Sequence, residues 1–405
     1  MRLLFFLLIS FFWALGLTLE QAVEVAIKNH TSLRLSFLEI QKAEEGIRRA
    51  RAGILPQVNF SYSYTRLSQE LAFGFTPRNR QSYNLEAEQT IFNKAVFEGL
   101  KLAKDQRELQ ELIKEDTLRE VEFQTKQLFY ALLYKREVVR LLEENLKYWE
   151  ENLRQTEGKF EAGVVPKVEL TRARAQLENA RAQLQSARTD YQKGLEDFRA
   201  FLRLDHSPEP QGSLDYRPPR TAEAQDNLKN NSTLKVARKN LEVAERFVEV
   251  QKSQYYPTLN FFANYQGNTA RVGGQTDMVD GYTFGARLNY RIFDGFGREA
   301  SIAQARIDVL KQAENLKDLE QRLKAEFSKT LEDIRSLQVQ IRALEASLEF
   351  ARESLRLSTE RYRFGVATQL EVLDATNTYN ATLQSYYLTL FQYNTALARL
   401  ERLTQ

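Results

Sequence analysis

Hydrophobic and polar residues alternate with a period of two in four short segments of the chain, and this alternation predicts β-strands. Each segment is about 10 residues long, the length that crosses a bilayer when a strand is tilted. The apolar positions are Val58, Phe60, Tyr62 and Tyr64 in the first segment, Tyr83, Leu85, Ala87 and Ile91 in the second, Leu259, Phe261, Ala263 and Tyr265 in the third, and Phe284, Ala286, Leu288, Tyr290 and Ile292 in the fourth.

The opposite face of these strands carries the charged residues Glu86, Glu88, Arg287 and Arg291. A dry core excludes unpaired charges, whereas a water-filled lumen accepts them. The pattern is therefore typical of a transmembrane barrel that is apolar outside and polar inside. A soluble antiparallel sheet with one wet face is the alternative on alternation alone. Four strands cannot close a barrel, so other copies must supply strands, and two copies would give about 8 strands and three about 12.

Two very long helices are predicted next to the strands. Residues 94 to about 160 and 298 to about 364 contain no proline and few glycines, which predicts helices of roughly 65 residues, about 98 Å long. Such helices must pack side by side as coiled coils, with apolar stripes as their seams. Each long helix ends at a Gly-Val pair, and the chain then returns as a second helix, because glycine accepts the left-handed conformation that stops a helix.

The chain also repeats itself at an offset of about 200 residues, which indicates an internal duplication. Four matches share this offset: Ile27-Lys28-Asn29 with Leu228-Lys229-Asn230, Leu55-Pro56-x-x-Asn59-Phe60 with Tyr256-Pro257-x-x-Asn260-Phe261, Ile91-Phe92-Asn93 with Ile292-Phe293-Asp294, and Phe160-x-x-Gly163-Val164 with Tyr362-x-x-Gly365-Val366.

These patterns give a predicted domain organisation. Residues 1–17 are a signal peptide and residues 207–220 a Pro-rich linker between two repeats. The first repeat, 18–206, has strands at about 57–67 and 82–92, a long helix at about 94–160 and a return helix at about 167–204. The second repeat, 221–405, has strands at about 258–267 and 282–293, a long helix at about 297–362 and a return helix at about 369–403.

Composition narrows the function. The 57 basic and 54 acidic residues leave a net charge of +3, so nucleic acid is not an expected partner. There is no cysteine, and His30 and His206 have no second ligand at metal spacing, so no metal or other cofactor is predicted. No nucleophile–base pair or phosphate loop supports an enzyme. The apolar run near residue 3 is too short for a membrane-spanning helix and indicates export.

The segment Tyr362-Arg363-Phe364-Gly365-Val366-Ala367-Thr368-Gln369-Leu370-Glu371-Val372-Leu373-Asp374-Ala375-Thr376 resembles the second hairpin tip of the TolC outer-membrane efflux family. The resemblance also covers the duplication and the run Ile292-Phe293-Asp294-Gly295-Phe296-Gly297. It implies a mainly α, α+β membrane protein that forms a homotrimer, with a 12-stranded barrel in the outer membrane and an α-helical barrel in the periplasm. The implied role is the exit duct of a tripartite efflux pump or a type I secretion system, in contact with outer-membrane lipid, a periplasmic adaptor and an inner-membrane transporter.

The resemblance also assigns roles to residues of the tips. Glu371 and Asp374, three residues apart on one helix face, would form rings of negative charge in a trimer, with Glu169 as the counterpart in the first hairpin. Tyr362 matches the gate tyrosine of the family, and the resemblance implies that its hydroxyl would reach Glu169 in a neighbouring hairpin. The turns Gly163-Val164 and Gly365-Val366 would meet the adaptor.

Ala367 stands where some members of that family carry an arginine, which predicts fewer links at the tip. Without the resemblance, Glu371 and Asp374 are ordinary residues at a helix start, favoured there by the helix dipole. The alternative for the whole chain is a secreted structural coiled-coil protein with a soluble β cap. A passive porin-like pore would not need helices of this length. Drugs, metal ions and secreted polypeptides all remain possible cargo.

Overall fold

The computed structural model describes residues 16–72, 77–216, 218, 228–272 and 275–405. Most of the predicted signal peptide, and residues 217, 219 and 220 of the predicted linker, lie outside the described residues. The chain divides into two compact units. The first comprises Met1–Leu35, Glu115–Ser232 and Glu320–Gln405, and the second comprises Ser36–Lys114 and Thr233–Leu319. In the part of the chain that the structure describes, no helix is long and apolar enough to cross a membrane.

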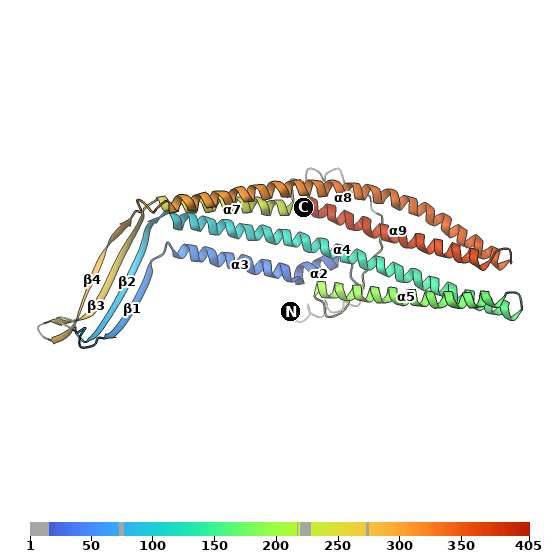
Figure 1. The fold of residues 1–405 in the computed structure, drawn as a ribbon, viewed down its shortest axis with the longest axis horizontal. Coiled ribbons are helices and arrows are strands. Elements are labelled where there is room, and N and C mark those ends of the chain that lie inside the picture. Colours follow the sequence, from blue (N-terminus) through green and yellow to red (C-terminus); the bar gives the residue numbers. More distant parts are fainter. Residues whose placement is uncertain (1–15, 73–76, 217, 219–227, 273–274) are drawn as a thin grey trace, which may run out of the picture. The chain divides into compact units, whose positions relative to one another are not determined.

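The second unit contains a four-stranded antiparallel sheet in the order β1-β2-β3-β4 (Figure 1). Its strands are β1 (Gln57–Arg66), β2 (Asn79–Asn93), β3 (Thr258–Val272) and β4 (Gln275–Asn289). The register places Phe60 opposite Leu85, Leu85 opposite Tyr265, and Tyr265 opposite Tyr282. Because side chains alternate along a strand, one face of the sheet is lined by the predicted apolar set.

The other face of the sheet carries the predicted polar set, and two of its charged residues, Glu88 and Arg287, contact β3. The Asn260 side chain donates a hydrogen bond to Glu88 at 2.8 Å. The Arg287 guanidinium lies 4.9 Å from the centre of the Phe262 ring. Gly285 faces Phe262 across the strand pair, and a Cβ at Gly285 would come within 3.2 Å of that ring. The polar face is therefore organised by cross-strand pairs rather than by burial.

Three details of the predicted strands are wrong. β3 extends past residue 267 to Val272, and β4 begins at Gln275 instead of about residue 282, so that Val272 lies opposite Gln275. At its other end β4 stops at Asn289, so Tyr290 and Ile292 follow the strand instead of belonging to it. The register of β2 against β3 shifts between Thr90 and Phe92. Ile91 is the extra residue of a β-bulge, so Phe92 lies opposite Leu259.

Helices continue directly from the sheet in the second unit. α4 (Lys94–Glu161) begins at the residue after β2, while α7 (Ser232–Lys252) and a short 3₁₀ turn, η3 (Ser253–Tyr255), precede β3. α3 (Thr31–Ala52) leads into β1, and α8 (Gly297–Arg363) follows β4.

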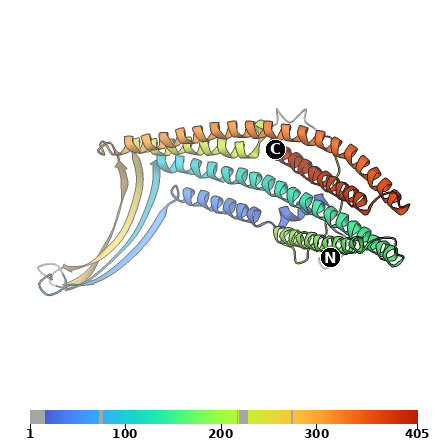
Figure 2. The same cartoon turned by 45° about the vertical axis from the view of Figure 1, so that its right-hand side comes forward.

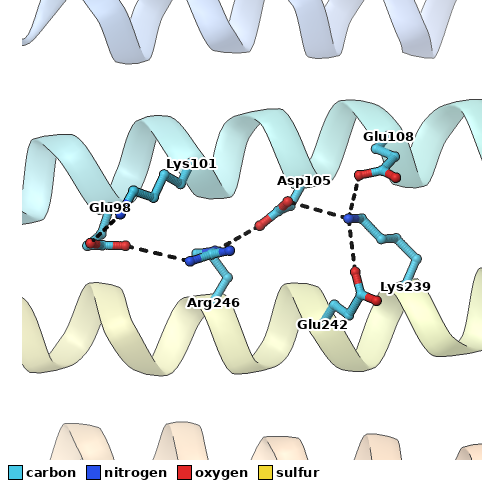
Figure 3. A network of polar contacts seen from close by, with 7 residues as sticks. All are labelled: Glu98, Lys101, Asp105, Glu108, Lys239, Glu242 and Arg246. Carbon is cyan, nitrogen blue, oxygen red and sulfur yellow. Dashed lines mark hydrogen bonds and ion pairs between the residues drawn. The ribbon is translucent and has the colours of Figure 1, made fainter.

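A network of charged side chains joins α4 to α7 (Figure 3). The Lys239 side chain is 8% exposed, and its Nζ lies 3.4 Å from Asp105, 2.5 Å from Glu108 and 3.0 Å from Glu242. Arg246 pairs with the same Asp105 at 2.9 Å. Burial of Lys239 disfavours its charge, but hydrogen bonds to Glu108 and Glu242 outweigh that effect and raise its pKa. The network fixes the register of the two helices.

The first unit holds two helical hairpins, in which α4 returns as α5 (Lys167–Leu202) and α8 returns as α9 (Gln369–Thr404) (Figure 2). A buried apolar cluster of Trp149, Leu177 and Ala180 joins α4 to α5, and Leu373 of α9 packs against it. This unit also contains α2 (Leu19–Asn29), which begins with a capping box between Thr18 and Gln21, and the 3₁₀ turn η2 (Leu228–Asn230).

Corresponding side chains of the two sequence copies make corresponding contacts. Asn29, the last residue of α2, donates to the carbonyl of Leu202 at the end of α5 at 3.4 Å. Asn231, after η2, donates to the carbonyl of Leu403 near the end of α9 at 3.1 Å. The sequence comparison aligned Asn29 with Asn230, whereas the contact belongs to the next residue, Asn231.

Candidate functional site

The two turns that end the long helices have the same backbone geometry. Gly163 and Gly365 have φ angles of 71° and 75°, in the left-handed region. The Gly163 and Val164 amides donate to the carbonyls of Phe160 and Lys159 at 2.9 and 2.8 Å. The Gly365 and Val366 amides donate to Tyr362 and Arg361 at 3.1 and 2.9 Å. Both turns are thus Schellman motifs with glycine at the position that requires positive φ.

Large apolar side chains are exposed at both turns, which we call the tips. In the second tip, Phe364 is 84% exposed and Val366 is 66% exposed. In the first tip, Val164 and Val168 are 69% and 59% exposed. Helix-hairpin ends normally expose polar residues, so apolar side chains at both tips are typical of a protein-contact surface.

The predicted carboxylates lie next to the tips in different surroundings. Glu371 forms a capping box with Thr368 at the start of α9, and it lies 3.9 Å from Arg361. The Thr368 backbone and hydroxyl, followed by Arg361, lower the pKa of Glu371. Asp374 is exposed on the same helix. Glu169 holds the equivalent position in α5, where the N-cap residue Pro166 offers no side-chain cap.

Arg361 was not foreseen as a partner of Glu371. Ala367 cannot form a salt bridge, but Arg361 approaches the same turn from α8 and its guanidinium reaches the Val366 carbonyl at 3.5 Å. Some members of the resembled family carry an arginine after the turn, where this chain has Ala367. Here Arg361, which precedes the turn, supplies the positive charge at this tip.

Tyr362 is buried, at 7% exposure, and its ring lies against the first hairpin. The Nζ atom of Lys159 lies 3.9 Å from the centre of the Tyr362 ring. Among the described residues, the buried Tyr362 hydroxyl has no hydrogen-bond partner. The predicted bond to Glu169 is therefore not formed within one chain, and a cation–π contact joins the two hairpins instead.

A second contact between the hairpins was missed by sequence reasoning. The buried Gln369 side chain donates to the side-chain oxygen of Asn152 at 2.9 Å. Asn152 and Thr156 are polar residues in a helix stripe that also contains Trp149 and Leu153, and Asn152 and Thr156 are both buried. A polar residue inside an apolar stripe signals a specific partner, because an unpaired buried amide is costly.

Comparison with known families decides the identity of this architecture. The family model described as outer membrane efflux protein matches residues 22–202 and 224–404. The chain belongs to the outer membrane efflux protein family. It is therefore an outer-membrane exit duct of efflux or secretion systems, located in the outer membrane and extending into the periplasm.

Individual relatives agree with this assignment. The chain is 23% identical over 381 residues to the outer membrane protein TolC of Escherichia coli (strain K12), covering 90% of this chain and 77% of that protein. It is 22% identical over 389 residues to the proteases secretion protein PrtF of Dickeya chrysanthemi, covering 89% and 82%.

Solved structures show the same fold. The CmeC outer membrane channel of Campylobacter jejuni has a TM-score of 0.83 at 17% identity, covering 95% of this chain and 85% of that one. The open state of the MtrE outer membrane channel of Neisseria gonorrhoeae has a TM-score of 0.81 at 17% identity, covering 95% and 88%. The predicted fold class, with long helical hairpins and four strands in each chain, is confirmed.

Proposed function

We propose that this efflux-family chain works as a homotrimer in which three four-stranded sheets close a 12-stranded barrel. The support is the sheet itself, whose two edges, β1 and β4, have no further strand within the described chain. Open strand edges are not tolerated in lipid, so neighbouring copies must pair them. The apolar face then contacts outer-membrane lipid, and the face with Glu88, Asn260 and Arg287 lines the water-filled passage.

The proposal assigns the gate and the selectivity to the tips. Threefold symmetry would convert Glu371, Asp374 and Glu169 into rings of negative charge, which favour cations at a constriction. The observation that carries this assignment is that Glu371 and Asp374 are both exposed on one helix, three residues apart, directly behind the turn. Tyr362 would act as a gate residue by holding the two hairpins together through Lys159.

The partners follow from the same surface. The turns Gly163-Val164 and Gly365-Val366 and the exposed apolar side chains beside them would dock a periplasmic adaptor protein, which links the duct to an inner-membrane transporter. Small side chains and exposed backbone at the turns allow another helical hairpin to approach closely. The proposed activity is passive conduction, with no catalytic step and no cofactor. The described residues contain no cluster of His, Asp or Glu suited to a metal ion.

Single-channel recording tests the proposal. Purified protein is inserted into a planar bilayer, and the reversal potential is measured under a salt gradient for the wild type and for Glu371→Ala/Asp374→Ala. We expect a cation-selective wild-type pore and a double variant whose reversal potential moves toward zero. Asp333→Ala/Glu349→Ala is the matched control, since it removes the same two charges from exposed positions of α8.

Two results would contradict the proposal in different ways. Unchanged selectivity in the tip variant, or an equal loss in the control, would show that the tip carboxylates do not line the constriction. Failure of the wild type to insert into the bilayer would favour a soluble coiled-coil protein with a β cap.

A further inference from the structure

A pocket of 430 Å³ lies where the sheet of the second unit passes into its helices. Lys94, the first residue of α4, and Lys252, the last residue of α7, line it together with Arg306 of α8. Tyr255 and Tyr256, just before β3, complete the wall. The pocket thus combines three cations and two phenol rings at the ends of β2 and β3.

The two carboxylates of the pocket, Glu249 and Glu299, already have partners within it. Glu249 pairs with Lys252 at 2.7 Å, and Glu299 accepts a hydrogen bond from the Tyr255 hydroxyl at 2.9 Å. Among the described residues, neither Lys94 nor Arg306 lies within ion-pair distance of a carboxylate. The pocket therefore offers two cations that remain available to an anion.

Lys94 lies against an aromatic ring and forms no direct ion pair with a described carboxylate. Its Nζ lies 3.9 Å from the centre of the Tyr256 ring. A hydrogen bond to Tyr256, together with the nearby carboxylates of Glu98 and Glu249, raises the pKa of Lys94, so its ammonium group stays charged. The β-bulge at Ile91 turns Phe92 to the apolar face beside Leu259. Lys94 follows Phe92 by two residues and is the first residue of α4, directly after the end of β2.

The loop after β4 adds apolar groups beside this pocket. Arg298 is 5% exposed and donates to the carbonyls of Arg291 and Ile292 at 3.0 and 3.2 Å. Its guanidinium also lies 4.8 Å from the centre of the Tyr255 ring, which ties the loop to the pocket wall. The loop exposes Ile292, at 82%, and Phe296, at 69%.

The backbone of this loop is unusual where it exposes the phenylalanine. Phe296 has a φ angle of 67°, directly after Gly295 at 71°. A bulky residue in the left-handed region costs free energy, so the conformation needs a compensating contact. The Phe296 ring packs edge-on against Phe293, with ring centres 5.5 Å apart, and insertion into the hydrocarbon edge of a bilayer would add to that contact.

We propose that this pocket binds the phosphate of an anionic phospholipid in the periplasmic leaflet, with Lys94 and Arg306 as the phosphate ligands. The inference rests on the proposed insertion of the sheet into the membrane, since the pocket then lies at the level of the lipid headgroups. Tyrosine side chains favour that level, and basic pockets beside membrane segments suit anionic headgroups. The lipid chains would run along the apolar face of β2 and β3, which a free phosphate ion could not use.

The site should discriminate between headgroups. Phosphatidylglycerol carries one net negative charge and no cation, so it can approach both side chains. Phosphatidylethanolamine carries an ammonium group that Lys94 and Arg306 would repel. We therefore expect a clear preference for phosphatidylglycerol over phosphatidylethanolamine.

Native mass spectrometry of the full chain tests this inference. The protein is released from nanodiscs of equal parts phosphatidylglycerol and phosphatidylethanolamine, and the retained lipid is counted for wild type and Lys94→Gln/Arg306→Gln. Each cation near a lipid phosphate contributes on the order of 1 kcal/mol, so loss of both should leave about thirtyfold less phosphatidylglycerol on the variant. The control Lys104→Gln/Arg342→Gln removes two exposed helix charges elsewhere and should retain lipid as the wild type does.

The outcomes separate this inference from the proposed function. Equal retention by wild type and variant, or equal retention of both lipids, would overturn the phosphate site. Displacement of the lipid by inorganic phosphate alone would also overturn it, because it would show a site for the free ion. The conductance of each variant is also measured in a planar bilayer. A variant that conducts and retains as much lipid as the wild type refutes the lipid site and leaves the proposed duct function standing. A wild type that cannot insert refutes both.

Discussion

Replacing Lys239 with methionine should destabilise the protein. Methionine keeps an unbranched, flexible side chain, one atom shorter than lysine, and removes the charge and the hydrogen-bond donors. The Lys239 side chain is 8% exposed and contacts carboxylates of two helices, Asp105 and Glu108 on α4 and Glu242 on α7. The substitution therefore removes charged hydrogen bonds between helices as well as one within a helix.

The magnitude follows from what remains after the substitution. Asp105, whose side chain is 20% exposed, keeps its ion pair with Arg246 at 2.9 Å. Glu108 and Glu242 are 59% and 61% exposed, so water replaces the lysine. The loss is then smaller than that of a fully buried pair, and we expect about 1.5–3 kcal/mol, the typical value of a hydrogen bond to a charged group.

Lys42→Met is the matched control. Lys42 pairs with Glu39 at 3.0 Å and three residues apart, the same distance and spacing as Lys239 with Glu242 in the opposite order, but its side chain is 77% exposed. An exposed pair of this kind contributes only about 0.3–0.5 kcal/mol. The two variants thus differ in burial and in the contacts between helices.

The assay is thermal unfolding of the detergent-solubilised protein, followed by circular dichroism at 222 nm. Lys239→Met should lower the melting temperature by a few degrees, and Lys42→Met should change it very little. The raised pKa of Lys239 means that its contribution is complete below the lysine pKa of the unfolded chain, about 10.4, and is lost as pH rises through the folded value. Equal melting temperatures for the two variants at pH 7 would refute the reasoning.

Three further predictions concern the two helical hairpins. Gly365→Ala should destabilise the second tip by about 1 kcal/mol because φ is 75° there, and backbone strain is the whole cost since no neighbouring atom crowds the new methyl group. Gly158→Ala, in open space inside α4, should stabilise the protein by a similar amount. Melting temperatures that shift in the same direction for both variants would contradict this. Glu371→Gln should lower the melting temperature at neutral pH but not well below pH 4. The pKa of Glu371 is lowered in the folded protein, so its charge stabilises the fold above the unfolded-state pKa, and this stability is lost as pH falls through the folded-state pKa. A difference in melting temperature that persists at pH 3 would show that the charge of Glu371 is not its cause. Trp149→Ala should cost about 3–5 kcal/mol because Trp149 is 3% exposed in the cluster that joins α4 to α5, and a melting temperature equal to that of wild type would refute its role in packing.

The sequence predicted the strand faces well because alternation is a local signal. Phe60, Leu85 and Tyr265 share a face as expected. The bulge at Ile91 was not predictable, because an inserted residue leaves the hydrophobic pattern readable in either register. The extension of β3 to Val272 was also missed, since Asn268, Thr269 and Arg271 place polar residues on both faces after Gly267 and interrupt the alternation.

At the tips, the sequence located the turns but not the contacts between hairpins. Gly163 and Gly365 were identifiable because a helix stop needs positive φ. The pairs Lys159–Tyr362 and Asn152–Gln369 join residues that are about 200 positions apart, and no local pattern places them together. Asn152 did carry a signal, as a polar residue in an apolar stripe, but only the structure supplies its partner.

The unequal start of the two return helices has a mechanical consequence. α9 begins with the Thr368–Glu371 capping box, whereas α5 begins at Pro166 without a side-chain cap. A cap of this kind contributes about 1 kcal/mol, so the first turn of α5 should fray about five times more readily than that of α9. In a ring of three chains, compliant and stiff hairpin ends would then alternate, and any force that widens the ring would bend every second end first.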